Sequence, residues 1–179
     1  MFKRKILEKL EAWKKSNLRK PLILSGARQV GKTTIVNEFG LQYDNYLYFN
    51  MEKSENVKLF EMEIPLDDLV TTLFASVGKA QKPGQTLIFI DEIQNSPKTI
   101  ALLRYFYEQR PDLHVIAAGS LLENLIDVKV SFPVGRVQYL ALRPCSFYEF
   151  LGATGKNNLL AVLNGNPEIS TAFHDQLMH

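Results

Sequence analysis

The sequence is poor in the residues that disulfides, metal clusters and membrane spans require. Cys145 is the one cysteine among 179 residues, which excludes an internal disulfide and fits a reducing compartment. The three histidines lack the spacing of a metal site. No apolar run approaches the ~18 residues of a membrane span, and the N-terminus lacks the apolar core of a secretory signal. We therefore expect a cytoplasmic protein without a membrane partner.

Composition indicates one ordinary globular domain. Apolar residues make up 46% of the chain and charged residues 22%. A chain of this length can bury a sizeable core. The formal net charge is only +2, so overall charge does not require nucleic acid as a partner.

The most informative segment is residues 21–34, which read PLILSGARQVGKTT. An apolar strand is followed by the pattern G-x-x-x-x-G-K-[ST] and then by a helical stretch, which is typical of a phosphate-binding loop. We expect the following residues to bind the phosphates: Gly26, Ala27, Arg28, Gln29, Val30, Gly31, Lys32, Thr33 and Thr34. The alternative is a glycine-rich strand–helix turn that binds nothing.

Two side chains of this loop have specific expected roles. Lys32 supplies a positive charge to the β- and γ-phosphates of a nucleotide, and the Thr33 hydroxyl is a ligand for Mg²⁺. For Arg28 we expect the backbone N–H to matter more than the guanidinium group.

A second motif supplies two adjacent carboxylates. Four apolar residues, Leu87–Ile90, precede Asp91 and Glu92, so a buried strand delivers both acids to its carboxyl end, where ligands of open α/β sheets bind. We expect Asp91 to hold Mg²⁺ through water and Glu92 to orient or deprotonate the attacking water. The alternative is a pair of solvated acids at a strand end.

The order of the expected elements predicts the fold class. Five short apolar segments are candidate strands: Leu22–Ser25, Tyr46–Met51, Thr86–Asp91, Val115–Ala118 and Val137–Leu142. Candidate helices lie between them: Lys32–Phe39, Asn56–Phe60, Leu66–Ala80 and Pro97–Glu108. This alternation predicts a parallel sheet with helices on both faces. Gly40 is expected to end its helix as a C′ glycine.

The two ends of the chain are less defined. Residues 2–18 have the periodicity of an amphipathic helix, and eight basic residues within the first 20 form either a solvated face or a contact for nucleic acid or an acidic partner. We expect a core domain over 1–144, including an N-terminal helix within 1–20. Residues 145–179 are expected to be helical, as the start of a lid or of a truncated C-terminal region. The candidate helices there are Ser146–Leu151, Asn157–Leu163 and Glu168–Met178.

Four segments together resemble a known family. They are residues 26–34, residues 89–94 (FIDEIQ), residues 118–120 (AGS), and residues 134–136 (VGR) leading to 142–151 (LRPCSFYEFL). Over about residues 1–150 the chain resembles a bacterial and archaeal family of predicted AAA-type ATPases. In that family an N-terminal ATPase module precedes a C-terminal domain of poorly defined function. We expect these 179 residues to be a truncated or degenerate relative without that domain.

The resemblance implies a three-layer α/β/α P-loop NTPase fold with a mainly parallel five-stranded sheet. Adjacent acids, together with one strand between the phosphate loop and the acids, look like the additional-strand, catalytic-glutamate division of this fold. The resemblance implies nucleotide binding at residues 26–34, Mg²⁺ at Thr33 and Asp91, and catalysis by Glu92. The guanine signature Asn-Lys-x-Asp is absent, which favours ATP over GTP.

Two further residues have roles that stay open. Ser120 ends the fourth candidate strand, where AAA-type ATPases carry a polar residue that senses the γ-phosphate or positions water; it also suits the N-cap of a helix over Leu121–Leu125. Arg136 is a trans-acting arginine finger, a sensor within its own chain, or an anchor for the fifth strand. Only a charge placed at the γ-phosphate would accelerate phosphoryl transfer.

Three functions compete. The first is an ATPase module that couples Mg-ATP turnover to a conformational change in an attached or partner domain. The second is a nucleotide-gated switch, or a DNA- or protein-binding module, with little turnover of its own. The third is a small-molecule kinase, against which the Asp91–Glu92 pair and the absence of an evident lid for a phosphate acceptor argue.

Overall fold

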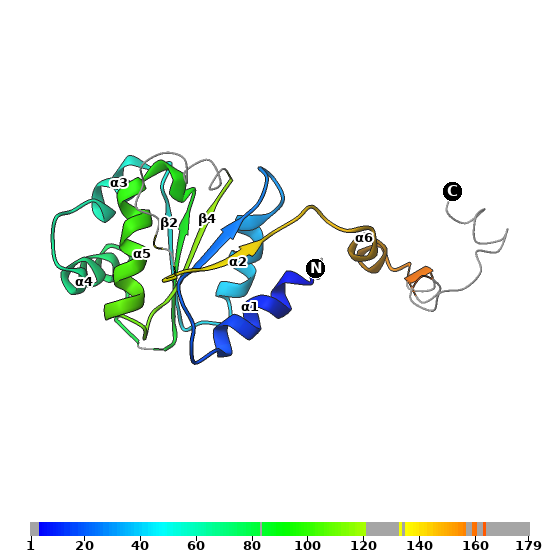
Figure 1. Ribbon diagram of the computed structural model, residues 1–179, viewed down its shortest axis with the longest axis horizontal. Helices are drawn as coiled ribbons and strands as arrows, with labels where there is room; N and C mark the ends of the chain where they lie inside the picture. Colours follow the sequence, from blue (N-terminus) through cyan, green and yellow to red (C-terminus); the bar gives the residue numbers. More distant parts are fainter. Residues whose placement is uncertain are drawn as a thin grey trace. The chain divides into compact units, whose positions relative to one another are not determined.

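The computed structural model describes residues 4–82, 84–120, 133, 135–156, 159, 160 and 163 (Figure 1). The described residues within Ile6–Pro144 form one compact unit. Arg4, Lys5 and the described residues from Cys145 onward form a second unit. The candidate helix Glu168–Met178 lies outside the described residues.

The first unit is built on a five-stranded parallel sheet. Its strands are β1 (Leu22–Ser25), β2 (Asn45–Asn50), β3 (Thr86–Asp91), β4 (His114–Gly119) and β5 (Gln138–Ala141), in the spatial order β2-β3-β4-β1-β5. Every residue of β3 and β4 is buried, as expected for inner strands covered on both faces. The prediction of an α/β fold with a parallel five-stranded sheet is confirmed.

Helices cover both faces of this sheet (Figure 1). The helical segments of the unit are α1 (Ile6–Lys15), α2 (Lys32–Gly40), α3 (Ser54–Phe60), α4 (Leu66–Ser76), the 3₁₀ turn η1 (Ile93–Asn95) and α5 (Pro97–Gln109). Side chains alternate along the strands, so Leu87 and Phe89 of β3 pack with α1 and α2, whereas Ile88 and Ile90 pack with α3, α4 and α5. The result is a three-layer α/β/α unit with two apolar cores.

The strand order brings the two sequence motifs to one edge of the sheet. In the registers of the sheet, Ser25 at the end of β1 lies opposite Gly119 at the end of β4, and Asn50 at the end of β2 lies opposite Asp91 at the end of β3. Because all strands are parallel, the segments that follow them meet at this carboxyl edge.

Gly40 differs from its expected role. It is the last residue of α2, and the residue that follows, Leu41, is right-handed at φ −62°, so Gly40 is not a left-handed C′ glycine. A Cβ at Gly40 would lie 2.7 Å from the Tyr46 ring, so the position needs a glycine because β2 passes close to it. The C′ prediction was wrong because close packing between elements cannot be read from a local pattern.

The N-terminal helix is shorter than predicted. It begins at Ile6 rather than at residue 2, and Ile6, Leu10 and Trp13 are its buried face. Arg4 and Lys5 belong instead to the second unit, where the Arg4 side chain and the Lys5 backbone N–H both donate to Glu149 Oε1, at 3.2 and 3.0 Å.

The helix of the second unit, α6 (Phe147–Ala153), begins with a capping box. Ser146 Oγ accepts a hydrogen bond from the Glu149 backbone N–H at 3.2 Å, and Glu149 Oε2 accepts one from the Ser146 backbone N–H at 2.9 Å. The candidate helix Ser146–Leu151 therefore forms, and its cap explains where it starts.

Candidate phosphate-binding site

The loop after β1 has the backbone geometry that its glycines predict. Gly31 has φ 93°, a left-handed conformation that favours glycine, and it directly precedes α2. A Cβ at Gly26 would lie 2.3 Å from the carbonyl oxygen of Leu142, so any larger residue would collide with backbone. Both glycines are required by the path of the loop, which delivers the N-terminus of α2 to the carboxyl edge of the sheet.

Lys32 is held at the base of this loop. Its Nζ donates hydrogen bonds of 2.9 Å to the carbonyl oxygens of both Gly26 and Ala27, and the residue is only 6% exposed. A buried ammonium group needs such partners, and its position concentrates positive charge beside the backbone N–H groups of the loop and helix.

Asp91 links the loop to the acidic strand. The residue is 2% exposed, and its Oδ2 accepts hydrogen bonds from Thr33 Oγ1 at 2.7 Å and from the Tyr48 hydroxyl at 3.2 Å. Its Oδ1 accepts one from the Glu92 backbone N–H at 3.0 Å. The Tyr48 ring stacks on Phe89, and burial, together with the Asp91 carboxylate, raises the pKa of Tyr48 to about 12. Tyr48 is therefore a neutral donor that fixes Asp91.

Glu92 departs from ordinary strand geometry at the end of β3. It has φ 52°, an uncommon conformation for a residue with a side chain, and such strain gathers at functional sites. Its Oε2 accepts a hydrogen bond of 2.5 Å from Gln94 Nε2. The other amide atom, Gln94 Oε1, is buried and has no hydrogen-bond partner among the described residues. The amide group of Gln94 therefore acts as a hydrogen-bond donor that orients the Glu92 carboxylate.

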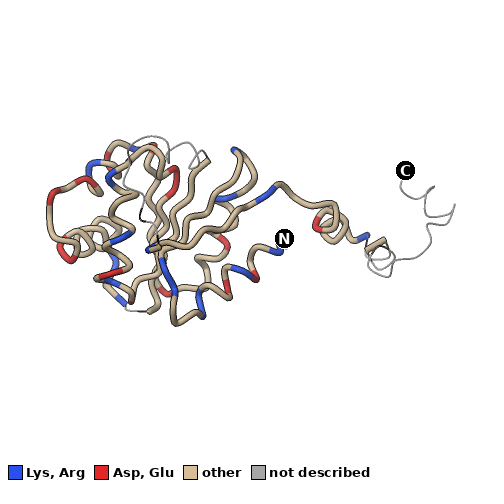
Figure 2. Tube along the Cα trace, viewed as in Figure 1, with Lys and Arg blue, Asp and Glu red and all other residues tan. Residues whose placement is uncertain are grey.

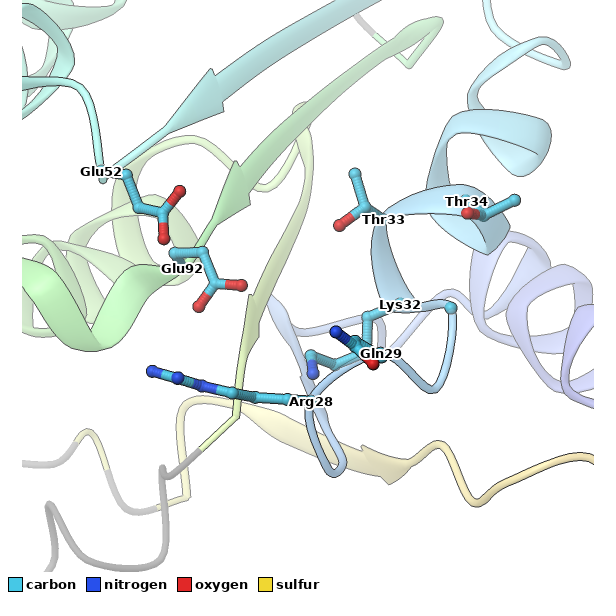
Figure 3. A pocket seen from close by; sticks show the side chains of 8 residues that line it. Arg28, Gln29, Lys32, Thr33, Thr34, Glu52 and Glu92 are labelled. Carbon is cyan, nitrogen blue, oxygen red and sulfur yellow. The ribbon is translucent and has the colours of Figure 1, made fainter.

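The two motifs enclose one cavity of ≈ 450 Å³ (Figure 3). Its lining residues are Arg28, Gln29, Gly31, Lys32, Thr33, Thr34, Glu52 and Glu92. The phosphate loop and α2 form one wall, and Glu52 and Glu92 project from the opposite wall (Figure 3). The volume lies within the range of ligand pockets, ~300–1,000 Å³.

Three lining or neighbouring residues have roles that the sequence did not indicate. Glu52 lies two residues beyond β2, and its backbone N–H donates to Asn50 Oδ1 at 2.7 Å. Tyr48 and Gln94 contact Asp91 and Glu92, as described above. The sequence does show that the second and third strands both end in polar residues. This pattern points to a shared site only once β2 and β3 are known to be neighbours.

The donor set fits a nucleotide with a magnesium ion. The Thr33 hydroxyl and the Asp91 carboxylate are hard oxygen ligands within 2.7 Å of each other, which suits Mg²⁺. Lys32 and the start of α2 suit phosphate oxygens. A pocket that combines cationic and carboxylate side chains matches a ligand that carries both negative phosphates and a divalent cation.

Ser120 lies at the same edge of the sheet, directly after β4. Its Oγ is buried and makes no hydrogen bond with any described residue. The predicted N-cap role concerns residues 121–125, which lie outside the described part of the chain. Sensing of the γ-phosphate by Ser120 therefore stays a prediction.

Arg136 lies at the opposite edge of the sheet. It precedes β5, whose first residue Gln138 pairs with Leu22 at the start of β1, whereas the phosphate loop follows the end of β1. Its Nε donates to Glu108 Oε1 at 3.2 Å. This pair anchors the entry to β5, and hydrogen bonds from Arg104 and Arg136 lower the pKa of Glu108. Of the three roles left open for Arg136, the contact with Glu108 fits the anchor of the fifth strand, whereas one strand length separates the residue from the site of its own chain. A trans-acting finger stays a prediction.

The AAA-domain family model matches residues 18–151, which include the phosphate loop, Asp91 and Glu92. The chain belongs to this AAA-domain family. Membership assigns the chain to the ATP-binding modules of this class. No curated protein sequence matches the chain.

Two examples among the solved structures that share the fold of this AAA domain are a Walker-type ATPase and an ORC1 protein. A Walker-type ATPase of Pyrococcus abyssi has a TM-score of 0.57 and 18% identity, over 95% of this chain and 60% of that protein. The ORC1 protein of Aeropyrum pernix, in complex with DNA, has a TM-score of 0.52 and 14% identity, over 86% of this chain and 48% of that protein. At these identities the similarity concerns the fold alone, and the chain spans less than two thirds of each protein.

No helix within the described ranges combines the length and the apolar character that crossing a membrane demands.

Proposed function

We propose that this AAA domain binds ATP with Mg²⁺ in the 450 Å³ cavity and hydrolyses the terminal phosphoanhydride bond. The observation that carries the proposal is the hydrogen bond between Thr33 and Asp91, which joins the phosphate loop to the end of β3, directly before Glu92. Phosphoryl transfer depends on this juxtaposition, because catalysis rests mainly on positioning and charge stabilisation.

Each residue has a defined part in this proposal. The backbone of residues 26–34 and the Lys32 ammonium bind the phosphates. Thr33 and Asp91 hold Mg²⁺, which neutralises charge between the phosphates. Glu92, whose carboxylate faces the cavity, orients a water molecule and accepts its proton. Ser120, at the end of β4, is a candidate to sense the terminal phosphate.

Coupling to another domain or protein completes the proposal. Three segments at the carboxyl edge carry residues of the site: the loop after β1, the turn after β2 with Glu52, and the end of β3. Ligand contacts that differ between the ATP and ADP states would change the relative stability of these segments, and an attached or partner domain could respond to that change.

A DNA-binding function has weaker support. The ORC1 structure contains DNA, but its similarity concerns the fold alone. Basic and acidic positions are interspersed along α1 (Figure 2). Three basic side chains near α1 donate to carbonyl oxygens of the protein itself: Lys14 to Gln42, Arg19 to Pro111 and Lys20 to Gly135. This alternative predicts that affinity for duplex DNA falls steeply as the salt concentration rises. It is rejected if the protein does not bind DNA at low salt, or if it binds weakly with an affinity that does not depend on salt.

Titration calorimetry of Mg-ATP, with phosphate release measured on the same sample, tests the proposed function. The wild-type chain should bind and turn over ATP, and Lys32→Ala should weaken binding by about tenfold or more, because it removes a charge-assisted contact. Lys53→Ala, an exposed lysine next to α3, is the matched control. Failure of the wild type to bind ATP would overturn the proposal.

A further inference from the structure

Arg28 differs from every other arginine of this chain. The sequence has seven arginines, and all seven lie in the described ranges. Six have interaction partners within the protein: Arg4, Arg19, Arg104, Arg110, Arg136 and Arg143. Arg28 makes no hydrogen bond or ion pair with any described residue, although it lines the cavity.

The direction of its side chain is informative. Arg28 extends from the phosphate loop toward the side of the cavity that carries Glu52 and Glu92, whereas Lys32 stays beside the loop (Figure 3). Lys32 is already bonded to two loop carbonyl oxygens. Arg28 is therefore the cation of the cavity whose donors are free for a ligand, judged over the residues that the structure describes.

Neither carboxylate on that side neutralises Arg28. The described contact of the Glu92 carboxylate is with Gln94, and the Glu52 carboxylate forms no ion pair with a described cation. A phosphoryl group that enters beside two carboxylates is repelled by both of them. A guanidinium group at this place offsets that repulsion, and it offers a planar pair of donors that matches two phosphate oxygens.

The proposed role of Glu92 indicates which end of a nucleotide would lie next to it. If Glu92 activates the attacking water, the terminal phosphoryl group lies next to it, and the nucleoside lies farther away. A cation on the same side of the cavity therefore meets the terminal phosphoryl group, which ATP has and ADP lacks.

We propose that the guanidinium group of Arg28 binds the terminal phosphoryl group of ATP from within its own phosphate loop, and so determines the preference of this site for ATP over ADP. The inference rests on the proposed nucleotide-binding function. It replaces the sequence-based expectation that the backbone of Arg28 matters more than its side chain. Arg28 would thus place a positive charge at the terminal phosphate from within the same chain. Arg136 of that chain cannot do so from the opposite edge of the sheet.

The test measures dissociation constants of ATP and ADP in the presence of Mg²⁺, in a Glu92→Gln background that prevents turnover. Arg28→Ala should weaken ATP binding by about tenfold, as expected for loss of a charge-assisted pair, and should change ADP binding by less than about threefold. Arg28→Lys should recover part of the loss, because it keeps the charge without the planar donors. Arg104→Ala, which removes an exposed arginine on α5, should leave the ratio unchanged.

The outcomes separate this inference from the function on which it rests. A wild-type preference for ATP that disappears in Arg28→Ala supports the inference. An unchanged ATP/ADP ratio in Arg28→Ala, or an equal loss of both nucleotides at an unchanged melting temperature, overturns it and leaves the proposed function standing. Failure of the parent protein to bind either nucleotide overturns both.

Discussion

Thr33 and Asp91 are 58 positions apart in the sequence, yet Thr33 Oγ1 donates a hydrogen bond of 2.7 Å to Asp91 Oδ2. Thr33 lies in the first turn of α2, and Asp91 ends β3. The contact depends on two parallel strands that reach the same edge of the sheet, with β4 between them. The sheet thereby places one hydroxyl and one carboxylate, both suited to Mg²⁺, beside the phosphate loop.

Replacement of Thr33 tests this metal site. Thr33→Val keeps the shape of the side chain and removes the hydroxyl, so Mg²⁺-dependent ATP affinity should fall by about tenfold or more. Thr33→Ser, which keeps the hydroxyl, should stay close to wild type. Calorimetry with Mg²⁺ and with excess chelator measures the difference. If the Val variant and the wild type bind ATP equally in Mg²⁺, Thr33 does not hold the metal.

Gln94 is expected to position Glu92. Loss of its hydrogen bond to Oε2 frees the carboxylate to rotate, so Gln94→Ala should lower kcat by about tenfold and leave ATP affinity within about twofold. Steady-state phosphate release and calorimetry on one sample separate the two quantities. Gln81→Ala, on the exposed segment before β3, is the control. A parallel loss of affinity and melting temperature would indicate a structural role for Gln94 instead.

The sequence predicts where some residues of this site lie in the fold, but it does not predict the residues that surround them. Strands β1 and β3 have the bounds that their apolar runs predict. Thr33 and Asp91 meet because motif spacing and parallel strand order agree. Glu52 and Tyr48 were missed because their place depends on β2 lying beside β3, which no local pattern gives.

Other residues could not be assigned from local patterns for the same reason. Arg136 matched a motif, but its position relative to the phosphate loop is fixed by the register of β5 on β1. Gly40 matched a helix end, but the Tyr46 ring on β2 determines why glycine is needed there. Both cases depend on tertiary packing rather than on neighbouring residues in the sequence.

Gly40 gives a prediction about stability. Alanine is favoured over glycine within a helix by about 1 kcal/mol, but a Cβ 2.7 Å from the Tyr46 ring overpacks the contact by about 1–3 kcal/mol. Gly40→Ala should therefore destabilise the protein, and its cost should shrink when Tyr46 is also replaced by Leu. Urea unfolding followed by the fluorescence of Trp13, the one tryptophan, measures all four members of the cycle. Strictly additive effects would show that the two positions do not interact.

His114 gives a prediction about pH. It is buried on β4 and shares a hydrogen bond of 2.6 Å with the Tyr43 hydroxyl. Burial, and then the positive charges of Arg19 and Lys14, lower its pKa from 6.5 to about 4. The unfolded chain therefore takes up a proton below pH 6.5 that the folded chain takes up only near pH 4, so His114 lowers stability as the pH falls across this window.

Comparison with a variant that does not titrate isolates this contribution. His114→Gln keeps a polar group for Tyr43, and its free energy of unfolding should fall less between pH 7 and pH 4.5 than that of the wild type. Urea unfolding at both pH values provides the measurement. Equal pH dependence in the two proteins would mean that folding does not lower the pKa of His114.

The most direct test of the ATPase account compares the wild type with Glu92→Gln, with Glu63→Gln on an exposed glutamate as the control. Calorimetry and phosphate release are measured on each protein with Mg-ATP. We expect all three to bind ATP with similar affinity, the wild type and the control to release phosphate at equal rates, and Glu92→Gln to be slower by about 100-fold or more, as for loss of a general base. Equal turnover by Glu92→Gln and the wild type would contradict the account.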